Sequence, residues 1–244
     1  MIIDTHCHLD LYPNPNSLIN ELEKQNVITI GMTNLPSHFK MGLPHTQNLK
    51  KIRLALGMHP LLALKHYSEF PLFFDYLNYT SYIGEIGLDF SKEGKETKHI
   101  QIKSFEKILK AVKLKKKILS IHSRNAEKEV LDMLRKHCIQ NAIFHWYSGS
   151  LKLIDEIVAS GYYFSINTAM IKSEKGKKII ARIPKENILT ETDGPFIKYR
   201  SRTVKSTDIK FILEYLNLEK NSVEMENQVS QNFKRLVSNI KEDQ

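Results

Sequence analysis

Short apolar runs alternate with longer amphipathic stretches along the whole chain, and this alternation constrains the fold more than any other feature. Eight runs have the length and composition of strands, and they span residues 1–5, 27–32, 53–58, 81–88, 117–123, 141–147, 162–167 and 186–193. Helix-like stretches such as SLINELEKQ (17–25) and NAEKEVLDMLRKHC (125–138) lie between them. Strand followed by helix, repeated eight times, predicts parallel strands joined by crossover helices.

We therefore expect an α/β protein of the closed (β/α)8 TIM-barrel class, formed by a single domain over residues 1–244. Two further helical stretches, near 206–217 and 222–238, follow the eighth strand and would add C-terminal helices. A doubly wound open sheet is the alternative for the same alternation. With 41% hydrophobic residues, the chain can bury one large core.

The composition limits where the protein works and what it binds. No stretch approaches the roughly 20 apolar residues of a membrane span, and no secretory signal precedes the first strand-like run. Two cysteines, Cys7 and Cys138, provide no disulfide framework. We expect a cytoplasmic protein without a membrane partner. The net charge of +9 favours a polyanionic partner such as nucleic acid, although many basic enzymes bind none.

Polar residues with useful chemistry gather at the carboxyl ends of the predicted strands. They are His6 and His8 after the first strand, His59 after the third, Glu85 late in the fourth, His122 closing the fifth, His145 late in the sixth and Asp193 closing the eighth. In a barrel of parallel strands all these positions lie on one face, where such enzymes keep their active sites. Five of the ten histidines follow this pattern, which random scatter would seldom produce.

The pattern predicts a metal site. His6 and His8 are two residues apart, so in an extended backbone their side chains leave on the same side. Taken alone, they could be polar residues of a turn, and a lone buried carboxylate more often holds a turn than a metal ion. Four histidines together with Glu85 and Asp193 instead form a plausible ligand set for two divalent ions. Such a pair of ions can activate water and stabilise a phosphoryl displacement.

Six ordered motifs and a late segment carry a resemblance to a known family. They are DTHCHLD (4–10), GMHP (57–60), IGEIGLDF (83–90), IHSR (121–124), FHWYSG (144–149), ETDGPF (191–196) and, later, QNFKRL (231–236). In these motifs the chain resembles the TatD family of metal-dependent deoxyribonucleases, within the amidohydrolase superfamily. The resemblance implies His6, His8 and Asp193 on one ion, His122 and His145 on another, and Glu85 between them. It implies two divalent ions, or three, with Mg, Mn and Zn as candidates.

The resemblance also suggests catalytic roles. We expect a metal-activated water to attack a phosphodiester, with Glu85 holding the ions and Asp193 orienting the water and taking its proton. His59 would contact the substrate phosphate or protonate the leaving oxygen. Arg124 offers a planar fork for phosphate oxygens.

Several residues near these motifs have two interpretations each. Glu191 would orient a ligand histidine, or it forms a structural salt bridge. Trp146 and Tyr147 would stack on a base, or they belong to the core or rim. Cys7 points away from its neighbouring histidines by strand alternation, so a thiol nucleophile is not expected. The lysine runs at 113–117 and 175–178 are expected to form a solvated surface away from the catalytic face, with a DNA track as the alternative.

The segment after the last motif departs from the family pattern. Many members continue with Arg-Gly and Asn-x-Pro, whereas this chain continues with IKYRSRTVKSTDI (197–209). Lys198, Arg200 and Arg202 in this basic stretch are candidates for contacts with a substrate backbone. Together with DLYPNP (10–15), the stretch is similar to QatD, the TatD-like component of a bacterial antiphage defence system. That similarity implies protein partners encoded alongside.

Three functions follow from these patterns. The first is a metal-dependent nuclease that acts on DNA, single-stranded and from an end. The second is a metallohydrolase of a small substrate such as an amide, a lactone or a D-aminoacyl ester, which could use the same site. The third is a DNA-binding or scaffold subunit of a defence complex. The basic charge and Arg124 favour a phosphate substrate, and the intact ligand set favours an enzyme over a scaffold.

Overall fold

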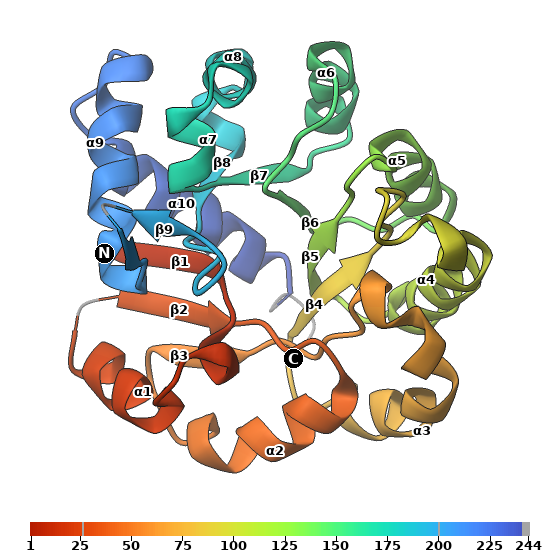
Figure 1. Ribbon diagram of the computed structural model, residues 1–244. Helices are drawn as coiled ribbons and strands as arrows, with labels where there is room; N and C mark the ends of the chain where they lie inside the picture. The colour runs from red at the N-terminus through yellow and green to blue at the C-terminus, as the bar shows by residue number, and fades with distance from the viewer. Residues whose placement is uncertain (26, 200, 241–244) are drawn as a thin grey trace.

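Eight parallel strands surrounded by helices form the molecule in the computed structural model, which describes residues 1–25, 27–199 and 201–240 (Figure 1). The strands are β1 (Ile2–Cys7), β2 (Val27–Gly31), β3 (Ile52–Leu54), β4 (Tyr82–Gly87), β5 (Ile118–His122), β6 (Ala142–His145), β7 (Tyr163–Ile166) and β8 (Ile188–Thr190). Strands such as β5, with the sequence ILSIH, are almost entirely buried. This is typical of parallel strands that are covered on both faces.

Helices follow the strands and cover the outside of the barrel. They are α1 (Pro15–Lys24), α2 (Pro36–Thr46), α3 (His66–Tyr76), α4 (Lys98–Val112), α5 (Glu127–Lys136), α6 (Leu151–Ala159), α7 (Thr168–Lys172), α8 (Glu174–Arg182), α9 (Ile209–Glu219) and α10 (Met225–Ser238). A short helix, η2 (Pro60–Lys65), precedes α3, and a small hairpin of β9 (Lys198–Tyr199) and β10 (Arg202–Thr203) precedes α9. None of the helices in the described ranges is long and apolar enough to cross a membrane.

The barrel closes at two seams. Its hydrogen-bonded sheets have the orders β1-β2-β3 and β4-β5-β6-β7-β8. A parallel bridge between Leu56 and Ile83 joins the first sheet to the second. At the other seam, Thr5 Oγ1 donates a hydrogen bond to the carbonyl of Thr190 at 3.0 Å, and Thr190 Oγ1 donates to the carbonyl of Ile3. The predicted closed barrel is thus confirmed, and the open sheet is excluded.

The core is continuous from the barrel interior to the surrounding helices. Inside the barrel, Ile30, Met32, Ile118 and Ile143 lie below the carboxyl ends of the strands. Each outer helix buries one apolar face against the sheet, as α6 does with its three buried residues Leu153, Ile154 and Ile157. This packing gives the strand ends a rigid base on which polar side chains can be held in fixed positions.

Helix α10 covers the opposite end of the barrel from those polar side chains. Asn232 is fully buried, and its Nδ2 donates to the carbonyls of Lys185 and Ile188 at 2.8 Å each. The ring of Phe233 is stacked on that of Tyr82, with centroids 6.5 Å apart. The segment QNFKRL (231–236), noted in the sequence, therefore anchors α10 to the start of β8.

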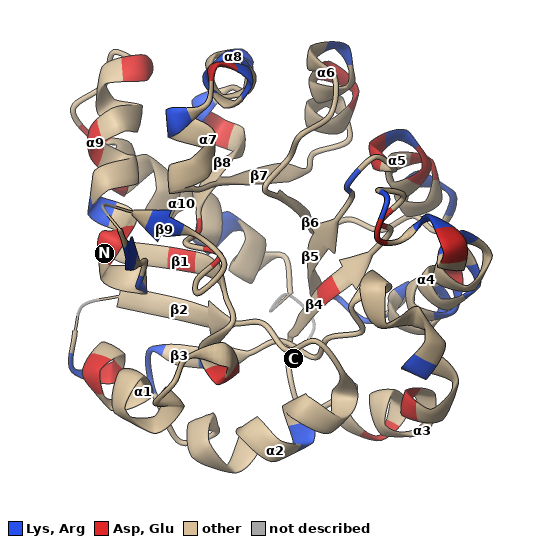
Figure 2. Ribbon diagram, viewed as in Figure 1, with Lys and Arg blue, Asp and Glu red and all other residues tan. Residues whose placement is uncertain are grey.

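The two lysine runs lie at opposite ends of the barrel, which corrects one expectation. Residues 113–117 lie between α4 and β5, at the amino ends of the strands, as expected for a surface away from the predicted site. Residues 175–178 lie in the first turn of α8, whose ribbon is largely blue, the colour of Lys and Arg, in Figure 2. Lys175 and Lys178 line a groove with residues that follow β5 and β6, so this run lies on the catalytic face.

Several elements differ in extent from the sequence prediction. Strand β3 ends at Leu54 and β8 ends at Thr190, earlier than the predicted limits of 58 and 193. The backbone turns after β8, where Asp193 has a φ of 48°, and this turn aims its carboxylate into the barrel mouth. Helices α2 and α3 contain Pro44 and Pro71, residues that disguise a helix in a sequence pattern.

Candidate metal centre

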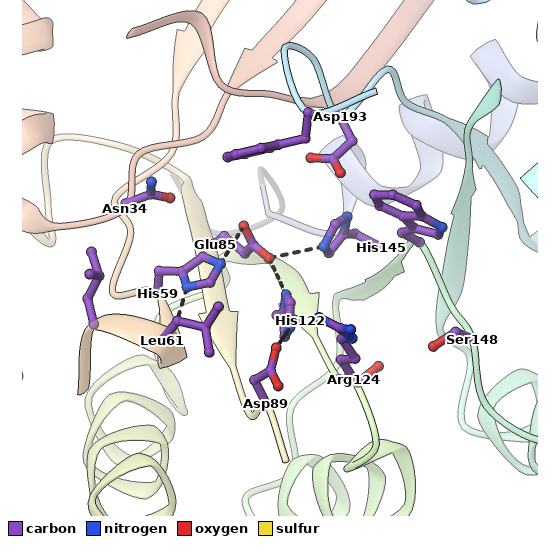
Figure 3. A pocket seen from close by; sticks show the side chains of 14 residues that line it. Asn34, His59, Leu61, Glu85, Asp89, His122, Arg124, His145, Ser148 and Asp193 are labelled. Atoms are coloured by element: carbon purple, nitrogen blue, oxygen red, sulfur yellow. Dashed lines mark hydrogen bonds and ion pairs between the residues drawn. The ribbon is translucent and has the colours of Figure 1, made fainter. Parts of the chain in front are cut away.

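The polar side chains at the carboxyl ends of the strands converge on one pocket of about 690 Å³ (Figure 3). Its lining residues are Asn34, His59, Leu61, Leu62, Glu85, Asp89, His122, Ser123, Arg124, His145, Trp146, Ser148, Asp193 and Phe196. They lie at or just after the carboxyl ends of six of the eight strands, β2 to β6 and β8, and in the η2 segment. The predicted convergence on one face is therefore what the fold produces.

Glu85 lies at the centre of this arrangement. Its side chain is buried, and its two oxygens face five histidine nitrogens: His122 Nδ1 at 2.5 Å, His145 Nε2 at 3.0 Å, His8 Nε2 at 3.3 Å, His59 Nε2 at 3.4 Å and His6 Nε2 at 3.6 Å. Burial alone would raise the pKa of Glu85, but the surrounding histidines outweigh it and hold the pKa well below its ordinary value. Glu85 is therefore a carboxylate with both oxygens available to ligands.

The two histidines of the first motif face the pocket together, as their spacing predicted. His6 Nε2 and His8 Nε2 are 3.2 Å apart, and Asp193 Oδ1 lies 3.7 Å from each of them. The backbone holds this cluster across the closing seam, because the Asp193 amide donates to the carbonyl of His6 at 2.9 Å. Asp4 adds to it by accepting hydrogen bonds from the amide and hydroxyl of Thr192 at 3.0 and 2.6 Å.

Three groups of side chains could each hold a metal ion, with ligand atoms that lie within 4.8 Å of one another. The groups are His6 with His8 and Asp193, His6 with Glu85 and His145, and His59 with Glu85 and His122. Imidazole and carboxylate donors in such sets suit zinc, manganese or iron. His122 and His145, which the sequence predicted on one ion, both face the same Glu85 oxygen, Oε1, and their placement on one ion stays a prediction.

His59 has a contact that identifies which of its ring nitrogens carries the proton. Its Nδ1 accepts a hydrogen bond from the Leu61 amide at 3.1 Å. A neutral imidazole with Nδ1 as acceptor carries its proton on Nε2, and burial lowers the pKa of His59, which favours that neutral form. In this arrangement Nε2 donates a hydrogen bond rather than offering a lone pair. This geometry suits the predicted contact with a substrate phosphate or leaving oxygen better than metal ligation.

Two of these histidines have a second polar partner at the ring nitrogen that faces away from Glu85. Ser120 Oγ lies 2.8 Å from His6 Nδ1, and Asp89 Oδ2 lies 2.8 Å from His122 Nε2. Burial alone would raise the pKa of Asp89, but its hydrogen bonds with His122 and Ser91 outweigh burial and lower the pKa to about 2. The sequence analysis gave Asp89 no role. Its signal was present in the motif IGEIGLDF, as a second carboxylate directly after a buried strand.

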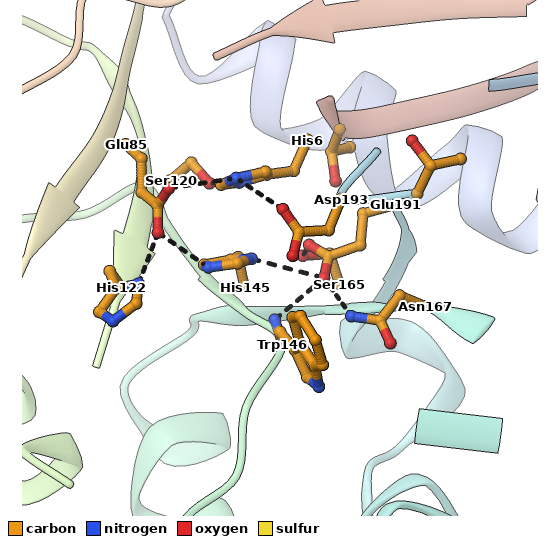
Figure 4. A network of polar contacts seen from close by, with 12 residues as sticks. His6, Glu85, Ser120, His122, His145, Trp146, Ser165, Asn167, Glu191 and Asp193 are labelled. Carbon is orange, nitrogen blue, oxygen red and sulfur yellow. Dashed lines mark hydrogen bonds and ion pairs between the residues drawn. The ribbon is translucent and has the colours of Figure 1, made fainter. Parts of the chain in front are cut away.

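A buried network holds His145 (Figure 4). Glu191 Oε1 lies 3.5 Å from His145 Nδ1 and accepts hydrogen bonds from the Trp146 amide at 3.1 Å and from Asn167 Nδ2 at 2.8 Å. The hydroxyl of Ser165 donates to the other oxygen of Glu191. Glu191 is therefore placed to orient His145. The other interpretation, a structural ion pair, would use the same contact between Glu191 and His145.

The pKa of Asp193 is shifted in the opposite direction from that of Glu85. Burial raises its pKa to about 7, although His145 and His8 act in the opposite direction. This pKa belongs to the metal-free centre, and a bound cation would lower it. The general-base role expected from the sequence stays a prediction.

Aromatic side chains form the rim of the pocket, but not both of those predicted. The Trp146 side chain is 38% exposed and lines the pocket. Tyr147 is 1% exposed, its hydroxyl donates to the carbonyl of Ser150 at 2.8 Å, and it packs in the core, so its predicted stacking on a base is wrong. Phe196 takes that place at the rim, 60% exposed with its ring 5.0 Å from that of His8. The sequence analysis missed it, although it closes the motif ETDGPF.

The basic residues proposed as substrate contacts are distributed differently. Arg124 lines the pocket, with its NH1 3.5 Å from Glu93 Oε2. Arg202 is bound by both oxygens of the buried Asp208, at 2.7 and 2.6 Å, so its expected contact with substrate is replaced by a structural ion pair. Lys198 lies exposed on β9, and Arg200 lies outside the described residues. Cys7 is buried away from the pocket, and burial raises the pKa of its thiol.

A closed (β/α)8 barrel with clustered histidines and carboxylates at its carboxyl face defines the class of metal-dependent barrel hydrolases. The family model described as TatD related DNase matches residues 3–238, and the chain belongs to this family.

Known relatives agree with this assignment. The putative deoxyribonuclease TATDN3 of Mus musculus is 27% identical over 213 residues, which cover 80% of this chain and 72% of the relative. The deoxyribonuclease TATDN3 of Homo sapiens is 24% identical and covers 80% of this chain and 78% of the relative. The crystal structure of the TatD homologue YjjV from Escherichia coli has a TM-score of 0.84 at 23% identity, covering 98% of this chain and 97% of that one.

Proposed function

We propose that the protein is a metal-dependent nuclease that hydrolyses phosphodiester bonds of single-stranded DNA from an end. The observation that carries this proposal is the position of Glu85, whose two oxygens face histidines on both sides within one pocket. The relatives named above support it, because mouse and human TATDN3 are described as deoxyribonucleases, the former putatively. The basic balance of the chain also suits a polyanionic substrate.

The donor set fits divalent ions. His6, His8 and Asp193 would hold one, and Glu85 would link it to a second group that includes His145 or His122. When bound, such ions stabilise charge on phosphoryl oxygens and lower the pKa of water. The protein's own groups supply the rest: Asp193 is placed to accept a proton, and His59 Nε2 is placed to donate a hydrogen bond to a phosphate or leaving oxygen.

Pocket size and rim favour an unpaired strand. A volume of about 690 Å³ suits one or two nucleotides, since sites of this size hold small molecules and a duplex does not enter them. A base in a duplex would first have to leave its stack, at a cost of a few kcal/mol, whereas an unpaired terminal base enters freely. Trp146 and Phe196 offer aromatic surfaces on which such a base could stack. Service in antiphage defence with partner proteins stays a prediction from the segment 197–209.

Degradation of end-labelled DNA tests the proposal. Oligonucleotides labelled at either the 5′ or the 3′ end are incubated with the protein and magnesium, manganese or zinc, with EDTA as control. We expect a metal-dependent ladder that shortens from one end and disappears in Glu85→Ala and Asp193→Asn. Metal-containing protein that cleaves no DNA but hydrolyses an amide, a lactone or a D-aminoacyl ester would replace the nuclease with the small-substrate hydrolase. If Glu85→Ala keeps its fold and its full cellular effect, the protein is a scaffold.

A further inference from the structure

A second groove, of about 520 Å³, adjoins the metal-centre pocket. It lies among the first turns of α5, α6 and α8, and Ser148 lines both cavities. In Figure 3, Ser148 lies at the edge of the pocket, away from Glu85. We call it the lysine groove, after Lys175 and Lys178, which line it together with Asn125, Gly149 and Ser150.

Lys175 and Lys178 are placed to act together. They are three residues apart on α8, so their side chains lie on the same face of the helix. Gly176 between them allows the helix to pack closely, because a Cβ there would lie 2.2 Å from the carbonyl oxygen of Met170. Both lysines are exposed. Neither forms an ion pair with a carboxylate in the described ranges, although the charge of Lys178 acts on Glu174, which pairs with Lys177 at 2.7 Å.

The lining of the lysine groove differs in kind from that of the metal-centre pocket. Apart from the two lysines and Glu127, it consists of Asn125, Ser148, Gly149, Ser150, Leu151 and Ile179, with no aromatic side chain. Glu127 Oε1 accepts a weak hydrogen bond from Ser148 Oγ at 3.4 Å, and two ammonium groups outnumber this one carboxylate. Aromatic surfaces bind bases, whereas lysines and small polar groups bind phosphates.

We propose that the lysine groove binds the phosphodiester backbone of the DNA strand that continues from the scissile phosphate, with Lys175 and Lys178, which line the groove opposite Asn125 and Ser148, as phosphate contacts. This inference rests on the proposed nuclease function. It assigns the two cavities separate tasks: the pocket holds the terminal nucleotide at the metal centre, and the groove holds the chain that remains. This division of tasks between the pocket and the groove explains why the second lysine run lies on the catalytic face.

The test separates long substrates from short ones. Metal-loaded wild-type protein, Lys175→Ala/Lys178→Ala and the charge-matched control Lys113→Ala/Lys116→Ala are given two substrates, fluorescent dT12 and thymidine 5′-p-nitrophenyl phosphate. The ester fills only the pocket. We expect the ratio of the KM for dT12 to the KM for the ester to rise about tenfold in the groove variant and to stay unchanged in the control. The slope of log Kd for dT12 against log salt, measured with Asp193→Asn added, should fall by about 1.4, because each phosphate contact on single strands contributes roughly 0.7.

Each outcome decides the inference. If the groove variant and the control shift the ratio equally, or if neither shifts it, the lysine groove does not bind the strand, while cleavage of the ester and dT12 by the wild type upholds the nuclease. If the wild type cleaves neither substrate, the nuclease function fails, and anisotropy of dT12 decides the groove alone. If only the groove variant binds dT12 more weakly, the lysine groove is a strand-binding surface. Equal binding by all three proteins would overturn the inference.

Discussion

The carboxylate of Asp89 lies 2.8 Å from Nε2 of His122, while Glu85 contacts the other nitrogen of the same ring at 2.5 Å. The imidazole is therefore held between two carboxylates, one in the centre of the pocket and one behind it. A carboxylate that contacts the other ring nitrogen of a metal-binding histidine, as Asp89 does, fixes the orientation of the ring and increases its basicity. Asp89 is thus a positioning residue that acts through His122.

Asp89→Ala should lower the metal affinity of the centre by about 10- to 100-fold, the usual effect of removing such a partner. Isothermal titration with manganese or zinc measures this, and the metal concentration needed for half-maximal DNA cleavage should rise in parallel. Asp75→Ala removes an exposed carboxylate from α3 and serves as control. Wild-type metal affinity in Asp89→Ala would show that Asp89 does not act through His122.

Trp146→Ala and Phe196→Ala should each raise the KM for single-stranded DNA. Stacking of one base on an aromatic ring contributes about 1–3 kcal/mol, which corresponds to roughly five- to hundredfold. An oligonucleotide with an abasic terminal position provides the control, because it cannot stack and should distinguish the variants little from the wild type. Equal effects on both substrates would mean that the two rings shape the pocket rather than bind a base.

Loading the centre with metal should release protons. In the metal-free protein, burial alone would lower the pKa of His145 and His122. Glu85 outweighs burial together with Glu191 at His145 and with Asp89 at His122, and both pKa values lie above the ordinary value. Imidazole binds metal in its neutral form, so metal must displace these protons. Addition of zinc in weak buffer near pH 7 should acidify the solution and raise the Tm, and EDTA should reverse the rise in Tm. Glu85→Ala should reduce both effects.

Asn232→Ala should destabilise the fold without touching the metal centre. It removes two buried hydrogen bonds and leaves the carbonyls of Lys185 and Ile188 without this donor. At about 0.5–1.5 kcal/mol for each of the two lost hydrogen bonds, the free energy of unfolding should fall by roughly 1–3 kcal/mol. Urea denaturation measures the loss, and Asn239→Ala, which removes one hydrogen bond to Asn141 at the exposed carboxyl end of α10, should lose less. Equal losses would refute the anchoring role of Asn232.

His66 should make stability depend on pH. Burial lowers its pKa to about 4, and its Nε2 donates to the carbonyl of His59 at 3.0 Å. The unfolded chain, with a pKa near 6.5, takes up a proton between pH 6.5 and 4 that the folded protein does not, so stability falls as the pH falls through this window. His66→Gln cannot titrate. The difference in unfolding free energy between wild type and variant, both with EDTA, should change by roughly 3 kcal/mol between pH 7 and pH 4. A constant difference would refute the assignment.

The sequence was sufficient to predict eight parallel strands with crossover helices and the face that carries the polar residues. The reason is physical: parallel strands covered on both faces need continuous apolar runs, and polar residues at their ends stand out against these runs. His6 and His8 could be placed on one side because strand alternation alone decides it. The closed barrel could not be separated from an open sheet, because the hydroxyls of Thr5 and Thr190 that close it have no periodic signal.

Individual roles at the rim were less predictable. Trp146 and Tyr147 are neighbours of similar chemistry, and only the turn after β6 sends one to the rim and the other into the core. Arg202 looked available for substrate because its pairing with Asp208, six residues later, depends on the fold of the hairpin β9–β10 and has no pattern in the sequence. The run at 175–178 was placed on the wrong face because α7 intervenes after β7, so α8 begins at the carboxyl ends of the strands.

The seam between β8 and β1 has a consequence for the synthesis of the protein. Thr5 and Thr190, which close it, are 185 residues apart, and the same seam unites His6 and His8 with Asp193. On the ribosome, the first histidines emerge long before the carboxylate that completes their cluster. A growing or prematurely ended chain that stops before residue 193 therefore lacks the carboxylate of this group. The cluster of His6, His8 and Asp193 can form only after both edges of the seam have been made.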